Sequence, residues 1–186
     1  MLNTWVGLVN NVSADGTALT ASVTETSIVS ALHKYTLPAN FCDFVGKKFR
    51  ITAYGRISTV TTPGTLTLKI KFGSIAVFTS GAMSLNASAK TNVGWKLDLL
   101  CEVRSIGIST SATVFGMGTF ESEGAVGGSV PTSGGLAAFL LPFNTAPVVG
   151  AGFDSTASQV LDLSATWGTS NANSILCHLL AIEALN

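Results

Sequence analysis

The sequence predicts an all-β protein, built as a sandwich or barrel of short strands. The first reason is that apolar and polar residues alternate over several runs, as expected when successive side chains of a strand point to opposite faces. The clearest run is 65–72, in which Leu66, Leu68, Ile70 and Phe72 share one face. The second reason is that turn residues separate these runs at the short spacing typical of sandwiches and barrels. No segment shows a convincingly capped helix.

Each expected element follows from its own pattern. The expected strands with alternating character are 49–57, 65–72, 95–104 and 114–123. Thr62-Pro63-Gly64 predicts a turn between the first two, and Gly73-Ser74 predicts a hairpin after the second. Gly116 and Gly118 interrupt the fourth run and indicate bulges or a close backbone approach. We expect a surface loop over 124–135 and a turn of helix over 152–159.

Two late segments, 136–141 and 175–182, are apolar on both faces. Apolar and polar residues alternate in a strand that faces solvent on one side, whereas a strand buried on both sides is apolar throughout. One face can meet the core of the sandwich, and the other then needs a neighbouring subunit or a loop of the same chain as its cover. We favour the neighbouring subunit. The residues expected at this subunit interface are Phe139, Leu141, Leu176, His178, Leu180 and Ile182.

The composition supports an assembling protein. Hydrophobic residues make up 47% of the chain and charged residues only 11%, whereas an ordinary soluble domain carries about a quarter charged residues. Ten basic residues balance ten acidic ones. This balance argues against a nucleic-acid partner, which needs a basic surface, and against an anionic membrane surface. The apolar excess is expected to be hidden against copies of the same chain or a larger assembly.

The first 25 residues lack a strong period. We therefore divide the chain into an N-terminal arm over 1–25 and one β-sandwich domain over 26–186. The arm either lies along a neighbour or is an extension that adds one strand to the domain.

The residues that carry chemistry are few. The only histidines are His33 and His178, and the three cysteines are Cys42, Cys101 and Cys177. Neighbours on a strand project to opposite faces, so Cys177 and His178 cannot form a nucleophile–base pair with each other. Metal-ligand spacings and phosphate-binding motifs are absent from the sequence. We expect no enzymatic activity, no metal and no cofactor, and we expect buried free thiols, since an odd number of cysteines disfavours a disulfide framework.

Several motifs between Tyr35 and Asn186 occur together. They are Tyr35-Thr-Leu-Pro-Ala-Asn-Phe41, Gly46-Lys-Lys-Phe-Arg-Ile-Thr-Ala-Tyr-Gly-Arg-Ile-Ser58, Thr62-Pro-Gly-Thr-Leu66, Gly152-Phe-Asp-Ser-Thr156, Val160-Leu-Asp-Leu163 and Ile182-Glu-Ala-Leu-Asn186. Over this stretch, roughly four-fifths of the chain, the sequence resembles small virion structural proteins of tailed bacteriophages. The resemblance implies a jelly-roll sandwich of the tumour-necrosis-factor type with two antiparallel sheets. It also implies a homotrimer built on the inner sheet.

The resemblance further implies a role on the virion, after assembly in the host cytoplasm. The leading expectation is a capsid decoration, or cement, protein that stabilises the phage head by binding the major capsid protein or another virion protein. The alternative is a receptor- or glycan-binding head domain of a spike or tail fibre. In the first case the N-terminal arm would contact the capsid. The residues expected at that contact are Trp5, Val6, Leu8 and Val9.

Overall fold

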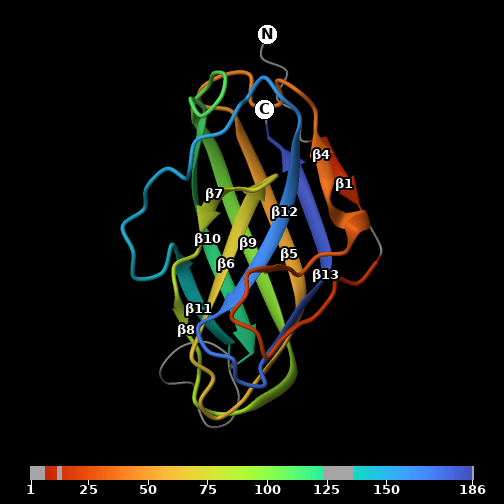
Figure 1. Cartoon of the computed structure of the whole chain (residues 1–186), viewed down its shortest axis with the longest axis vertical. Coiled ribbons are helices and arrows are strands. Elements are labelled where there is room, and N and C mark those ends of the chain that lie inside the picture. The colour runs from red at the N-terminus through yellow and green to blue at the C-terminus, as the bar shows by residue number, and fades with distance from the viewer. Residues whose placement is uncertain (1–6, 12–13, 124–135, 186) are drawn as a thin grey trace.

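The computed structural model describes residues 7–11, 14–123 and 136–185, and these residues form mainly β-strands (Figure 1). The strands are β1 (Gly7–Asn11), β2 (Leu19–Thr20), β3 (Thr26–Ser27), β4 (Tyr35–Leu37), β5 (Lys48–Thr59), β6 (Thr65–Phe72), β7 (Ile75–Thr79), β8 (Met83–Ser84), β9 (Lys90–Ser105), β10 (Thr113–Glu123), β11 (Leu136–Leu141), β12 (Gln159–Trp167) and β13 (Ser174–Ala184). A short 3-10 helix, η1 (Ala31–His33), precedes β4. Within the described ranges, no helix has the length and apolar character needed to cross a bilayer.

The strands form two antiparallel sheets that pack face to face. The larger sheet has the order β1-β13-β5-β9-β10-β11, and β2 also pairs with β13. The smaller sheet has the order β3-β12-β6-β7, with β4 on β12 and β8 on β6. In Figure 1, β6 and β12 are drawn over the strands of the larger sheet. The prediction of an all-β protein with two antiparallel sheets is therefore confirmed.

The four alternating runs are strands, as predicted, and their apolar faces form the core between the sheets. In β6, each of the four residues on the predicted inner face is buried. Phe49 of the larger sheet stacks on Phe72 of the smaller sheet with a centroid distance of 6.2 Å. Phe72 in turn meets Phe153 edge-on at 5.0 Å. These rings join the two layers, and each gains the stabilisation expected of a fully buried aromatic side chain.

The glycines of β10 allow a close backbone approach, as their position in the run predicts. A Cβ atom added to Gly118 would lie 2.0 Å from the carbonyl oxygen of Asp98 on the neighbouring β9. A Cβ atom added to Gly116 would lie 2.8 Å from the ring of Phe78, which belongs to the opposite sheet. Only glycine fits at such distances without a shift of the neighbours.

The described part of the predicted N-terminal arm lies on its own chain. β1 and β2 both pair with β13 in the larger sheet, and β3, which directly follows the arm, pairs with β12 in the smaller one. The indole N–H of Trp167 donates a hydrogen bond to the carbonyl oxygen of Leu19 at 3.1 Å. This segment therefore passes along the side of the sandwich and connects both sheets.

The prediction of a helical turn over 152–159 is wrong. The segment is irregular, and Phe153 forms an isolated bridge with Ala112. Asp154 explains the local turn, because its Oδ1 accepts hydrogen bonds from the backbone N–H of Thr156 at 2.9 Å and from its hydroxyl at 2.6 Å. Such an Asx turn competes with the hydrogen bonds of a helix.

Candidate interaction surface

The outer face of the larger sheet, which points away from the core, is the most extensive candidate site. It is formed by the outward residues of five strands, β13, β5, β9, β10 and β11. The described ones include Lys48, Arg50, Thr52, Tyr54, Arg56, Lys96, Asp98, Leu100, Glu102, Arg104, Phe115, Met117, Thr119, Glu121, Ala138, Leu140, Leu179, Ala181 and Glu183. We refer to this set as the outer face. The smaller sheet covers only the opposite, inner face.

Apolar side chains on the outer face lie in pairs or at its edge. The strand register places Tyr54 beside Leu179 and Leu100 beside Met117, and Leu140 stands on the edge strand β11. These five side chains are between 36% and 65% exposed. A single exposed apolar residue is ordinary, but several on one continuous sheet face indicate a surface that a partner covers.

Charged residues between these apolar groups pair within the chain. Asp98 contacts Arg50 at 3.5 Å and Lys96 at 3.7 Å, so its carboxylate is shared by two cations. A second carboxylate, that of Glu102, is shared in the same way by Lys48 and Arg104, both at 3.1 Å. Each such pair stabilises the fold only weakly because water reaches it. With Arg56, Glu121 and Glu183, the face carries five cations and four carboxylates and is therefore close to neutral.

The aliphatic residues predicted at a subunit interface are buried by their own chain instead. Three of them lie in the core between the sheets, whereas the register places Leu176 beside Arg56 on the other face of the larger sheet. Leu141, Leu176, Leu180 and Ile182 are all buried within one chain, and Leu180 is only 3% exposed. Phe139 is half-buried and stacks against Phe143 with a centroid distance of 4.2 Å. The inference that a neighbour must cover these four aliphatic side chains therefore fails, and the same strands present other residues to solvent.

A β-bulge accounts for part of this difference. The pairing of β13 with β5 shifts register between Cys177 and Leu179, so the alternation of the strand changes phase there. As a result Leu180 shares the core-facing side with Ile175 and Cys177, while Leu179 faces outward beside Tyr54 and is exposed. The sequence pattern alone did not single out Leu179 or Leu140. The signal that could have found Leu140 is its alternation with Phe139 and Leu141.

The other predicted site residues are placed as follows. The imidazole Nδ1 of His178 lies 2.7 Å from Asp15 Oδ1, which ties β13 to the segment after β1. Trp5 and Val6 lie outside the described residues. Leu8 and Val9 belong to β1, which pairs with β13, and their side chains lie outside the described part of the structure. The expected capsid contact of these four residues stays a prediction.

The three thiols are free and buried, as predicted. Burial raises the pKa of Cys42 to about 11 and that of Cys177 to about 12, and it raises the pKa of Cys101 further. The reactive form of cysteine is the thiolate, which such pKa values make scarce at neutral pH. The sulfur of Cys177 lies 3.2 Å from the carbonyl oxygen of Leu179, while His178 faces Asp15.

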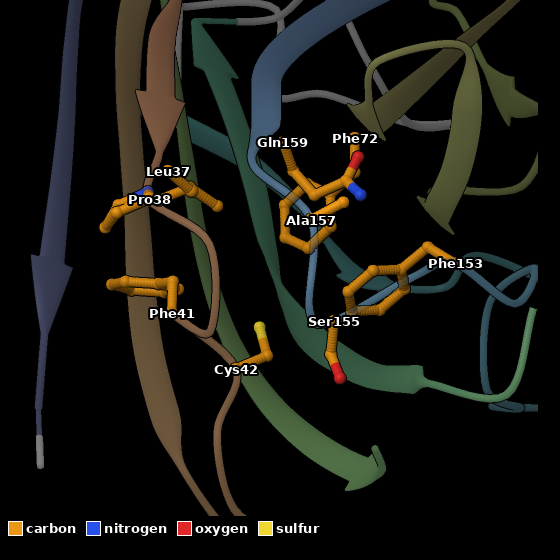
Figure 2. A pocket seen from close by; sticks show the side chains of 9 residues that line it. All are labelled: Leu37, Pro38, Phe41, Cys42, Phe72, Phe153, Ser155, Ala157 and Gln159. Atoms are coloured by element: carbon orange, nitrogen blue, oxygen red, sulfur yellow. The ribbon is translucent and has the colours of Figure 1, made fainter. Parts of the chain in front are cut away.

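A small cavity lies next to Cys42 at one edge of the sandwich. Figure 2 shows its lining: Leu37, Pro38, Phe41, Cys42, Phe72, Phe153, Ser155, Ala157 and Gln159. Its volume of about 10 Å³ is the space of one water molecule. Pockets for small organic ligands are usually some 300–1,000 Å³. Across the described residues, no group of three or more His, Cys, Asp or Glu could hold a metal ion.

The chain has no match among protein-family models, curated proteins or solved structures.

Proposed function

We propose that this chain is a non-enzymatic structural protein that assembles as a homotrimer and decorates the head of a tailed bacteriophage. The observation that carries self-assembly is the outer face, where paired apolar side chains remain open to solvent on the larger sheet. The resemblance of residues 35–186 to phage virion proteins supports the threefold symmetry of the assembly and its location on the phage head. A jelly-roll fold of the tumour-necrosis-factor type belongs to the same proposal.

A second copy of this chain suits the outer face because its two central carboxylates are already compensated. Asp98 and Glu102 each hold two cations of their own chain, so burial against a neighbour leaves neither of these two carboxylates unpaired. A nearly neutral face also avoids long-range repulsion between identical subunits. Association then depends on covering Tyr54, Leu179 and their apolar neighbours, at about 25 cal/mol for each Å² removed from water.

A decoration protein stabilises a shell by mass action. Because it binds the assembled shell and not the free shell subunits, it shifts the equilibrium toward the shell. Three copies on one trimer raise the effective affinity without any new type of contact.

Native mass spectrometry of the purified protein tests self-assembly. We expect a mass three times that of the 19.1 kDa chain. The variant Leu179→Asp places an uncompensated carboxylate on the outer face and is expected to give the single chain. The matched control Val160→Asp changes an exposed residue on a strand of the other sheet and is expected to stay trimeric. A single-chain mass for the unchanged protein contradicts the proposal.

Imaging of purified virions tests where on the virion the trimer is located. Antibody or tag labels are expected on the head lattice. Labels confined to the tail tip, together with saturable binding of the isolated protein to host cells or glycans, would establish the receptor-binding role instead.

A further inference from the structure

Two loops at one end of the sandwich project large apolar side chains into solvent. One loop joins β4 to β5 and carries Phe44 and Val45, and the other joins β9 to β10 and carries Ile106 and Ile108. Their exposed fractions are 43%, 60%, 43% and 69% in that order. We call these four residues the apical patch. Both loops lie at the end of the molecule where the C-terminus is found (Figure 1), and Leu185 donates a backbone hydrogen bond to Lys48 there.

Backbone hydrogen bonds fix the first loop in place. The N–H of Lys47 bonds to the carbonyl of Phe44, and Gly46 has φ +92°, so residues 44–47 form a tight turn with Val45 at its tip. A positive φ at this position is the normal role of glycine in such a turn. Gly46 and Lys47 also exchange hydrogen bonds with Val103 on β9, at 2.8 and 2.9 Å.

The second loop is held to the same end through Ser155. The N–H of Gly107 bonds to the Ser155 hydroxyl, the N–H of Ser155 bonds to the Gly107 carbonyl, and both distances are 3.0 Å. Ser155 also accepts a backbone hydrogen bond from Asn40 in the first loop region. The apolar side chains are therefore displayed on a frame that is ordered before any partner arrives, which lowers the entropy cost of binding.

The charges beside the apical patch do not favour a lipid surface. Lys48 and Arg104, which flank the two loops, each lie 3.1 Å from the carboxylate of Glu102. Lys47 bonds to Asp43 at 3.0 Å and lies over the rings of Phe41 and Phe44, 4.9 and 5.5 Å from their centroids. Its side chain is only 15% exposed, so its ammonium group is committed within the chain. Binding to an anionic bilayer needs available cations around the apolar residues. A protein surface with an apolar recess needs none.

The area of the apical patch determines whether one patch is enough to form a stable contact. Four side chains at these exposed fractions present on the order of 400 Å², within the range of interaction patches on monomers. A stable one-to-one contact, including an end-to-end dimer, needs roughly 800 Å² on each partner. One patch is therefore too small, whereas three patches on one trimer reach about 1,200 Å² and act together.

We propose that the apical patch is the contact by which the trimer binds a repeating protein surface, one that offers an apolar recess to each of the three patches. This inference rests on the proposed function and names the end of the molecule that faces the shell. Phe44, Val45, Ile106 and Ile108 enter those recesses, and the opposite end of the sandwich faces solvent.

The test uses phage heads assembled without this chain, mixed with the purified protein and separated by sedimentation. The double variant Val45→Asp/Ile108→Asp is expected to bind these heads at least tenfold more weakly than the unchanged protein while keeping its native mass. The matched control is Leu32→Asp/Val148→Asp, which alters residues that are 70% and 67% exposed elsewhere on the surface. It is expected to bind normally.

Each outcome separates this inference from the proposed function. If the double variant binds heads like the unchanged protein, the apical patch is not the contact, although decoration stands. If the unchanged trimer does not bind heads, both proposals fail. If the protein instead floats with vesicles of anionic phospholipid and the double variant does not, the partner is a bilayer and this inference is overturned.

Discussion

The acid stability of this protein should depend on one carboxylate, that of Glu25. Glu25 precedes β3 and reaches the outer side of the smaller sheet. Its Oε2 lies 2.6 Å from the ammonium group of Lys69, its Oε1 lies 2.7 Å from that of Lys71, and Oε1 also accepts a hydrogen bond from the hydroxyl of Ser164 at 3.2 Å. The hydrogen bonds from Lys69 and then Lys71 lower the pKa of Glu25 from 4.5 to about 2.

This pKa determines how much Glu25 contributes to the free energy of unfolding and over which pH range the contribution is lost. A fall from 4.5 to about 2 corresponds to a ceiling of about 3.4 kcal/mol, at about 1.36 kcal/mol for each pH unit. The three side chains are between 23% and 32% exposed, so water weakens the interaction. We therefore expect about 1.5 kcal/mol. Because the folded-state pKa is the lower one, this stability is present above about pH 5 and is lost as the pH falls toward 2.

The variant Glu25→Gln keeps the shape of the side chain and removes its charge. Urea unfolding at pH 7 is expected to show a free energy of unfolding about 1.5 kcal/mol below that of the unchanged protein, and the difference should shrink toward zero near pH 2. The control Asp43→Asn removes a carboxylate that pairs with Lys47 and is 52% exposed, against 28% for Glu25, and its effect should be a few tenths of a kcal/mol. A difference for Glu25→Gln that is absent at pH 7, or equally large at pH 2.5, would refute this reasoning.

Two further predictions concern the packing of the sandwich. Gly118→Ala is expected to lower the free energy of unfolding by about 2–4 kcal/mol, because its Cβ would collide with the carbonyl oxygen of Asp98. Gly94→Ala, where a Cβ meets nothing within 4 Å, should change it by less than about 1 kcal/mol, and chemical denaturation of both variants checks this. The three buried thiols should react with a thiol reagent at pH 8 only after unfolding, and rapid reaction of the folded protein would contradict their raised pKa values.

The long strands could be predicted because one physical signal determines them. In β6 and in the central parts of β5 and β9, one face meets the core and the other meets water, so the sequence alternates. The short strands of the N-terminal segment have no such signal. β2 and β3 hold two residues each and pair with different sheets, and only the folded sandwich determines where they lie.

The candidate surface was harder to predict for a related reason. An apolar run such as 136–141 has the same appearance in the middle of a sheet and at its edge. The structure places β11 at the edge of the larger sheet, with Leu140 exposed and Leu141 buried. In β13, a bulge decides which leucine faces solvent, and a bulge is set by the pairing partner as much as by the strand itself.

The positions of the ion pairs explain what the few charged residues of the chain do. In the described structure, eight of the ten basic residues and five of the ten acidic residues form ion pairs with each other. These pairs lie on the outer face around Asp98 and Glu102, beside the apical patch at Lys47, and over the smaller sheet at Glu25. Charges that are paired within the chain repel neither copies of it nor a neutral partner. If the chain associates as proposed, short-range apolar contacts decide the association at both surfaces, and specificity then comes from the shape of the partner.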